Sequence, residues 1–312
     1  MKRLGALRWL LVAGLALGSI GSAAQDSLSA GGKRNEQFLW PALGHGQAVV
    51  RHAAYALVYS EEHEQARWVA YELTEAETHG PEERSSGFYE DPDVPTGSAT
   101  DADYAGSGFD RGHLAPAGDM TWSSTAMTES FYYSNMSPQQ PSFNRGIWKK
   151  LETLARAWGQ TYGAVFIITG PVLEAGLPVI GPNKVSVPAA YYKIILRYNG
   201  NDWHAIAFLL PNAASSDPLT TFVRPVDEIE KRTGLDFFPA LPDDLENGLE
   251  AAVDQAKWDW TASWMNRTES MEARPAKENH SGESVQCSGI TKAGSRCHNR
   301  TNSPSGRCHL HQ

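Results

Sequence analysis

The sequence predicts an α+β protein with a mostly antiparallel sheet and flanking helices. Several short runs rich in Val, Ile, Tyr and Trp are separated by Gly, Pro and Asn, which is typical of strands joined by turns. Helical segments do not alternate regularly with these runs, so a doubly wound parallel sheet is not expected. A polar stretch and a Cys- and His-rich segment close the chain, and they predict a linker followed by a separate small module.

The first 24 residues have the pattern of a secretory signal peptide. Basic residues precede a short apolar run, and small residues follow it at Ser22, Ala23 and Ala24. The apolar run is short for a membrane span, which needs about 20 residues. The pattern predicts cleavage after Ala24, a mature protein outside the membrane, and a secreted or periplasmic location. Residues 25–39 are expected to form a polar N-terminal segment.

The main domain is expected to span residues 40–264. It opens with a hairpin over residues 55–73, where two strand-like runs flank the polar sequence EEHEQA. Residues 74–108 are rich in Gly, Pro, Ser, Asp and Glu and predict a long surface loop, which in a compact domain is more often functional than idle. Three further strands are expected over residues 164–173, 190–200 and 203–212.

The segment FDRGHLAPAGDM, residues 109–120, places an acid, a base and an imidazole close together at Asp110, Arg111 and His113. A histidine can be neutral near pH 7 and take a proton from water. The planar guanidinium of Arg111 suits a phosphate. In the alternative interpretation, His113 is a core histidine, and Asp110 and Arg111 form a surface salt bridge.

An amphipathic helix is expected from Asn144 onward. Apolar residues recur there at helical spacing, namely Ile147, Trp148, Leu151, Leu154, Ala155 and Trp158. At about 100° per residue, Asn144 falls inside the apolar stripe, with Glu152 and Arg156 at its edge. A buried amide needs a partner, and its carbonyl oxygen suits a divalent cation. The alternative makes Asn144 an N-cap, and Glu152 and Arg156 an i, i+4 surface pair.

These motifs resemble the DNA/RNA non-specific endonuclease family, the ββα-metal or His-Me finger nucleases that include endonuclease G-like enzymes. The resemblance rests on DRGHLAP followed by FYYSNMSPQQPSFNRGIWKKLETLAR, and it extends more loosely over the main domain. D-R-G-H, S-N-x-x-P-Q and F-N-x-G-x-W-x-x-L-E occur in the family's order and spacing. The resemblance implies a ββα-metal finger, built from the DRGH strand and the Asn144 helix, against an antiparallel sheet.

The resemblance also implies a role for each matching residue. His113 would be the general base that activates the attacking water. Asn144 would bind a hydrated Mg²⁺, which Mn²⁺ could replace, and Glu152 would hold the water shell of that ion. Asn135 would position His113 or the substrate.

Three arginines complete the implied site. Arg111 and Arg156 would contact phosphate and stabilise its extra negative charge in the transition state. Arg84 is the nearest candidate for a further arginine before the motif, although its spacing to FYEDP differs from the family's pattern.

The predicted function is that of a secreted, metal-dependent hydrolase of DNA and RNA that binds backbone phosphates. The formal net charge is -9, so the protein as a whole does not attract a polyanion such as a nucleic acid. Local basic segments or a bound cation must therefore bind its phosphates. The basic residues concentrate at Arg145, Lys149, Lys150 and Arg156, and in the tail at Lys292, Arg296, Arg300 and Arg307. A homodimer is left open. The alternatives are a small-ester phosphodiesterase or nucleotide pyrophosphatase on the same fold, or a nucleic-acid- or surface-binding protein.

The end of the chain predicts a polar linker over residues 265–286 and a small module over residues 287–312. In the module, C-x9-C-x10-C-x2-H offers three thiolates and an imidazole, as a tetrahedral zinc site does. These candidate ligands are Cys287, Cys297, Cys308 and His311. The alternative is one disulfide and one free thiol, which an oxidising compartment would favour.

Overall fold

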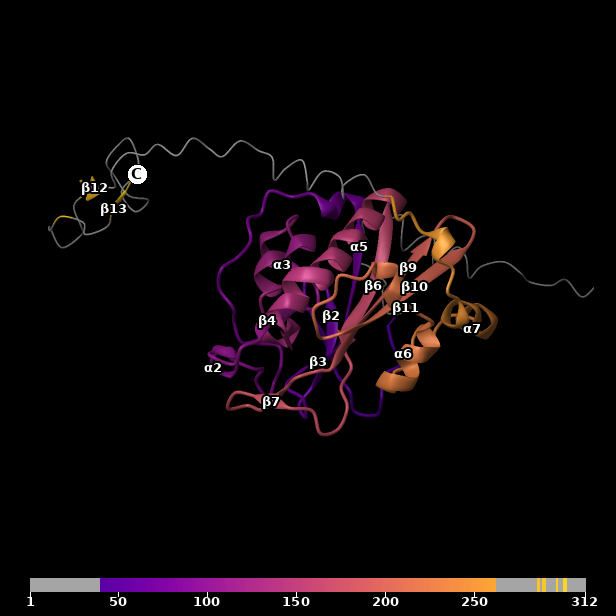
Figure 1. The fold of residues 1–312 in the computed structure, drawn as a ribbon, viewed down its shortest axis with the longest axis horizontal. Coiled ribbons are helices and arrows are strands. Elements are labelled where there is room, and N and C mark those ends of the chain that lie inside the picture. The colour runs from indigo at the N-terminus through magenta and orange to yellow at the C-terminus, as the bar shows by residue number, and fades with distance from the viewer. Residues whose placement is uncertain (1–39, 262–284, 287, 290–295, 297–299, 302–312) are drawn as a thin grey trace, which may run out of the picture. The chain divides into compact units, whose positions relative to one another are not determined.

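A seven-stranded antiparallel sheet is the centre of the protein (Figure 1). The computed structural model describes residues 40–261, together with residues 285, 286, 288, 289, 296, 300 and 301. In spatial order the strands are β1 (Val49–Arg51), β2 (Ala56–Ser60), β3 (Gln65–Thr74), β6 (Ala164–Pro171), β9 (Ala190–Tyr198), β10 (Trp203–Pro211) and β11 (Val223–Arg224). The predicted α+β class, hairpin and three later strands are confirmed.

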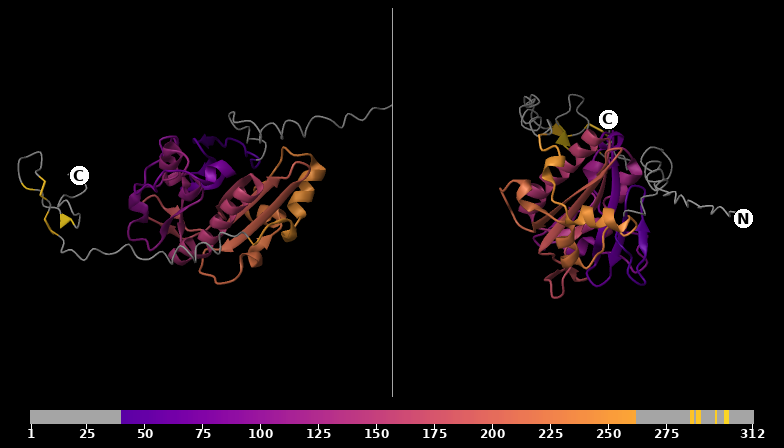
Figure 2. Two further views of the ribbon diagram at one scale, coloured as in Figure 1. Left: turned by 90° about the horizontal axis from the view of Figure 1, so that it is seen from above. Right: turned by 90° about the vertical axis from the view of Figure 1, so that its right-hand side faces the viewer.

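Helices cover both faces of this sheet (Figures 1 and 2). Helix α5 (Lys149–Tyr162) packs on one face, where Trp158 stacks on Phe208 of β10 with 6.2 Å between ring centroids. Helices α6 (Val226–Thr233) and α7 (Asp243–Ala251) pack on the other face. Side chains of a strand alternate between the two faces. Ile194 of β9 therefore belongs to the α6–α7 core, whereas its neighbour Lys193 lies under the α5 side.

Smaller elements surround the sheet. They are the 3₁₀ turns η2 (Glu75–Thr78), η3 (Ala117–Asp119), η4 (Tyr133–Asn135), η6 (Leu219–Phe222) and η7 (Gln255–Lys257), the short helices α2 (Asp101–Tyr104) and α3 (Ser124–Glu129), and the strand pair β7 (Val179–Ile180) and β8 (Val185–Ser186). No helix in the part of the chain that the structure describes is both long and apolar enough to cross a bilayer.

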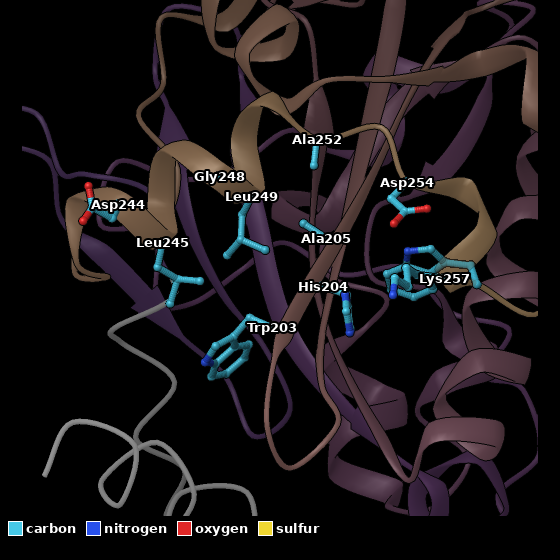
Figure 3. A pocket seen from close by; sticks show the side chains of 11 residues that line it. Trp203, His204, Ala205, Asp244, Leu245, Gly248, Leu249, Ala252, Asp254 and Lys257 are labelled. Atoms are coloured by element: carbon cyan, nitrogen blue, oxygen red, sulfur yellow. The ribbon is translucent and has the colours of Figure 1, made fainter. Parts of the chain in front are cut away.

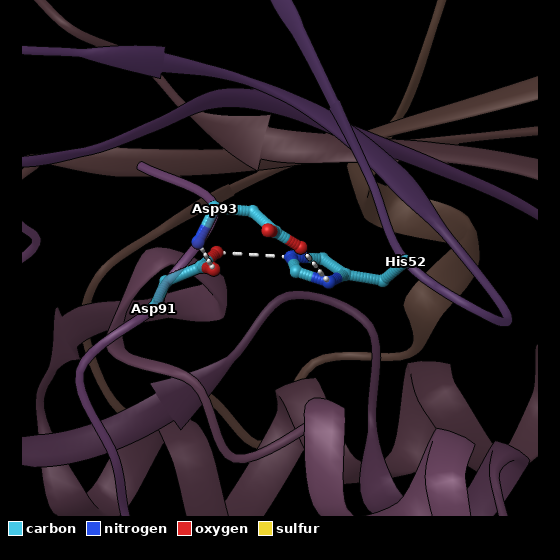
Figure 4. Close-up of side chains that lie close together, drawn as sticks. All are labelled: His52, Asp91 and Asp93. Carbon is cyan, nitrogen blue, oxygen red and sulfur yellow. Dashed lines mark hydrogen bonds and ion pairs between the residues drawn. The ribbon is translucent and has the colours of Figure 1, made fainter. Parts of the chain in front are cut away.

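The long segment predicted as a surface loop is fastened to the sheet by a histidine (Figure 4). The Nε2 of His52, just after β1, lies 2.9 Å from Asp91 Oδ2, and its Nδ1 lies 3.8 Å from Asp93 Oδ2. Asp91 also accepts hydrogen bonds from the Ser134 hydroxyl and the Asp93 amide. Both ring nitrogens of His52 already face carboxylates, so we interpret this group, named here the His52 clasp, as a fastening of the loop rather than a metal site.

The chain divides into two units, the first ending at Ala262 and the second beginning at Ser263. In the second unit, strands β12 (Val285–Gln286) and β13 (Arg300–Thr301) form an antiparallel pair. The predicted zinc ligands Cys287, Cys297, Cys308 and His311 lie outside the described residues, so the zinc module gains no support from the structure. The predicted N-terminal segments and most of the predicted linker lie outside them as well.

Candidate active site

Most of the predicted site residues lie on or beside a ββα unit. Strand β4 (Asp110–His113) pairs antiparallel with β5 (Met136–Gln139), and the helical segment that contains Asn144 follows β5 directly. Gly112 faces the buried side chain of Gln139, and a Cβ at residue 112 would lie 2.3 Å from Gln139 Cδ. Only glycine therefore fits at this position of the DRGH motif.

The helix begins earlier than predicted. It opens with α4 (Pro141–Phe143), where Gln140 is the N-cap and Pro141 occupies the first turn, as proline often does. A π-helical segment, η5 (Asn144–Trp148), then joins α4 to α5, with non-helical backbone angles at Gly146. Asn144 has helical backbone angles, so the alternative that made it an N-cap is wrong.

His113 ends strand β4 and is only 6% exposed. Phe131 packs edge-on against its ring at 4.8 Å between centroids, and Phe88 lies at 6.0 Å. Its Nε2 is buried without a hydrogen-bond partner. Burial, aided by the positive charge of Arg84, lowers the pKa of His113 from 6.5 to about 3, so the imidazole is neutral at physiological pH.

Arg84 belongs to the same site although the sequence indicated it only weakly. It is exposed on the long loop, and its Cζ lies 5.0 Å from the centroid of the Phe131 ring, the ring that also packs against His113. Its charge lowers the pKa of both His113 and Glu152. Arg84 thus links the loop electrostatically to strand β4 and helix α5.

Asn144 is held by Asp110. Its Nδ2 donates to Asp110 Oδ2 at 2.9 Å. The same carboxylate accepts two hydrogen bonds from Arg145, at 2.8 Å from Nε and 2.6 Å from Nη2. Because the amide nitrogen is bonded to Asp110, the carbonyl oxygen is the atom of Asn144 that remains for a cation.

Glu152 is half-buried on the inner side of α5. Burial raises its pKa, and the positive charge of Lys193 opposes that rise. Lys193 is itself completely buried, with no hydrogen-bond partner for its Nζ, which lies 4.9 Å from the Trp148 ring centroid. The sequence reasoning missed Lys193, although a lysine in the middle of the apolar run AYYKIIL was a visible signal.

Arg156 does not form the surface pair with Glu152 that one interpretation allowed. Its Nε donates instead to Asp119 Oδ1 at 2.7 Å, and the Tyr71 hydroxyl donates to the other oxygen of that buried carboxylate at 2.8 Å. A Cβ at Gly118 would lie 2.4 Å from Arg156 Nη2, so a side chain there would displace the guanidinium from this position. Asp119, which the sequence reasoning also missed, therefore fixes the orientation of Arg156.

Arg111 and Asp110 do not pair with each other. Neighbouring residues of a strand point to opposite faces. Arg111 donates to the Tyr133 hydroxyl at 3.1 Å and forms an ion pair with Asp101, while Asp110 binds Asn144 and Arg145.

Asn135 is fully buried and is bonded to the backbone that follows His113. Its Oδ1 accepts from the Ala115 amide at 2.9 Å, and its Nδ2 donates to the carbonyls of Ala115 at 2.9 Å and Ser130 at 2.8 Å. These bonds hold the segment after β4 in register with the turn before β5.

An antiparallel α+β fold whose ββα unit carries a buried histidine among arginines and acids is the architecture of a ββα-metal nuclease. A family model described as DNA/RNA non-specific endonuclease matches residues 41–244. The chain belongs to this family, and it is a nuclease and a hydrolase.

Named relatives and a solved structure agree with this assignment. Mitochondrial endonuclease G of Bos taurus is 38% identical over 236 residues, which cover 71% of this chain and 79% of the relative. Nuclease C1 of Cunninghamella echinulata var. echinulata is 38% identical over 218 residues, covering 64% of this chain and 85% of the relative. The crystal structure of the EndoG/EndoGI complex matches with a TM-score of 0.63 and 31% identity, over 70% of this chain and 96% of that chain.

The relatives contradict the predicted secreted or periplasmic location. The endonuclease G relatives of Bos taurus and Homo sapiens are designated mitochondrial. The first 24 residues contain Lys2, Arg3 and Arg8 and no acidic residue. Basic residues without acidic ones are also a feature of mitochondrial transit peptides. The composition of the first 24 residues therefore does not distinguish a secretory signal peptide from a mitochondrial transit peptide.

Proposed function

We propose that this nuclease cleaves the phosphodiester backbone of both DNA and RNA, with His113 as the general base. The observation that supports this most strongly is the neutral, enclosed imidazole of His113 with the positive charge of Arg84 close to it. A neutral imidazole can accept a proton, and arginines suit the negative charge of the phosphate. Because contacts to backbone phosphates carry no base information, little sequence preference is expected.

The donor set of the site suits Mg²⁺, which Mn²⁺ could replace. Asn144 would hold the ion through its carbonyl oxygen, since Asp110 binds the amide nitrogen, and Glu152 would accept hydrogen bonds from its water shell. Oxygen donors and few protein ligands are what Mg²⁺ prefers. When bound, the ion would supply positive charge for the leaving oxygen.

His113 would take its proton through Nδ1, because Nε2 is enclosed and has no partner. The negative charge of an incoming phosphodiester favours the imidazolium form, so the basicity of His113 rises as the substrate enters. The Trp148 indole donates to the His113 carbonyl at 3.4 Å. Together with the Asn135 bonds to Ala115, this contact would hold the end of β4, and hence the imidazole, in position.

Three arginines would neutralise the phosphate. Arg84 is proposed to contact the substrate from the loop, and Arg111 from strand β4. Arg156 is held by Asp119 and would contribute from helix α5. Each side chain has a partner that orients it, so less conformational entropy is lost when the phosphate binds.

Cleavage of supercoiled plasmid and of structured RNA, with Mg²⁺ and with excess EDTA, tests the proposal. We expect both polymers to be cut with Mg²⁺ and neither with EDTA. His113→Ala should lower turnover at least ~10²-fold, a typical contribution of a general base, while DNA binding persists. His45→Ala, which removes an exposed histidine, serves as the matched control and should cleave normally. Unchanged turnover of His113→Ala would remove this residue from the mechanism.

A further inference from the structure

Helices α6 and α7, on the sheet face away from α5, bring a second group of acids together. Two triads each offer three carboxylate oxygens that all lie within 4.8 Å of one another. The members are Asp227, Glu230 and Glu250 in one triad, and Asp236, Glu246 and Glu250 in the other. Asp227 and Glu230 lie on α6, Asp236 lies in the connection, and Glu246 and Glu250 lie one helical turn apart on α7.

Glu250, the shared member, is buried. It is 7% exposed, and its Oε1 has no hydrogen-bond partner. An unpaired buried carboxylate is unfavourable unless it is protonated, paired or bound to a metal. Five carboxylates thus converge here, and the buried Oε1 of Glu250 lies among them without a partner, where a cation could pair with it.

We propose that these two triads bind Ca²⁺, with Glu250 as the central ligand. Ca²⁺ takes oxygen ligands at about 2.3–2.6 Å in flexible arrangements. Two ligands of one such ion are therefore at most about 5 Å apart, which agrees with the spacing within each triad. Mg²⁺ prefers to keep several waters in a strict octahedron, so a crowded set of carboxylates favours Ca²⁺.

The expected effect of Ca²⁺ at this place is structural. The ligands come from both helices and from the segment that joins them, so the ion would connect α6 to α7. Both helices contribute to the core of that sheet face, through Val226 and Ile229 of α6 and Leu249 of α7. A ligand that binds only the folded state raises its stability by RT ln(1 + [L]/Kd), where [L] is the free ligand concentration.

Thermal unfolding and calorimetric titration with CaCl₂ in the Asn144→Ala background test the proposal, because that substitution removes the proposed nuclease metal ligand. We expect Ca²⁺ to raise the melting temperature by at least ~3 °C at a hundredfold excess over its Kd. Glu250→Gln should weaken Ca²⁺ affinity at least tenfold. The double variant Asp227→Asn/Asp236→Asn removes one carboxylate from each triad without changing the buried residue, and it should weaken affinity as well.

Asp244→Asn is the matched control. It removes one acidic charge from the same helix, but Asp244 belongs to neither triad and lines the pocket between α7 and β10 (Figure 3). Ca²⁺ affinity should be unchanged in this variant. The proposal is overturned if Ca²⁺ has no effect on the Asn144→Ala protein, or if Asp244→Asn weakens binding as much as the triad variants do. Either result would leave the proposed nuclease mechanism untouched, since no nucleic acid is present in this test.

Discussion

His113 should make the stability of the protein depend on pH. Its pKa falls from 6.5 to about 3 on folding, so the unfolded chain binds more protons than the folded chain between these values. The stability that His113 contributes is complete above pH 6.5 and is lost as the pH falls toward 3. The loss amounts to about 2 kcal/mol near pH ~5.

Urea unfolding across this pH range measures that loss. His113→Gln should flatten the dependence of unfolding free energy on pH, whereas His45→Gln, at an exposed position, should leave it as in the parent protein. The quantity to compare is the slope of unfolding free energy against pH. The glutamine substitution can also change the unfolding free energy by the same amount at every pH, which leaves that slope unchanged. Parallel curves for the parent and His113→Gln would show that His113 titrates normally in the folded protein.

Candidate site residues could be recognised from the sequence where a motif contains them. Asp110, Arg111, His113 and Asn144 lie in two short segments, and the structure places these segments on one ββα unit. Asp119 lies inside the segment FDRGHLAPAGDM, but nothing in the sequence indicates that it would pair with Arg156. Lys193 lies outside both segments. Lys193 comes from a strand that is distant in sequence, and only the pairing of β9 with β6 in the sheet brings it near Glu152 of α5.

At the scale of elements, hydrophobic periodicity predicted the long strands and the middle of the main helix. It missed the start of that helix. The helix begins at Pro141, and the π-helical segment η5 between α4 and α5 interrupts the regular helical spacing of the apolar residues. It also missed β4 and β5, which are four residues each and have little alternation. Their pairing depends on tertiary contacts, such as the Ser137 hydroxyl with Gln65 and Tyr191, that no local pattern reveals.

The His52 clasp should determine the order of the loop that carries Arg84. Asp91→Ala removes a buried acceptor from His52, Ser134 and the Asp93 amide. It should lower the free energy of unfolding by about 3 kcal/mol, as loss of buried charged hydrogen bonds does. It should also slow nucleic-acid cleavage, because Arg84 would be held less firmly.

Asp93→Ala is the control for the clasp. Its side chain is 62% exposed and lies 3.8 Å from His52, so the change should cost less than about 1 kcal/mol. Limited proteolysis of the loop, read by mass spectrometry, should show faster cutting in Asp91→Ala than in Asp93→Ala. Equal cutting rates in the two variants would mean that the clasp does not order the loop.

For the molecule as a whole, all residues proposed for catalysis lie between Arg84 and Arg156, within the first unit. The tail instead contributes basic residues at Lys292, Arg296, Arg300 and Arg307, with no acidic residue from Cys287 onward. Lys and Arg strengthen nucleic-acid binding by releasing counterions from phosphates. We therefore expect a chain ending at residue 262 to keep the kcat of the full protein and to show a higher KM.

Steady-state cleavage at several salt concentrations separates the two parameters. The increase in KM on truncation should be largest at low salt and shrink as salt is added, because screening removes the same contribution in the full chain. A full-length variant with the four basic tail residues replaced by glutamine should reproduce the truncated protein if charge is what matters. A fall in kcat on truncation would instead mean that the tail contributes to the chemical step, and the active site would then have to include residues beyond the antiparallel domain.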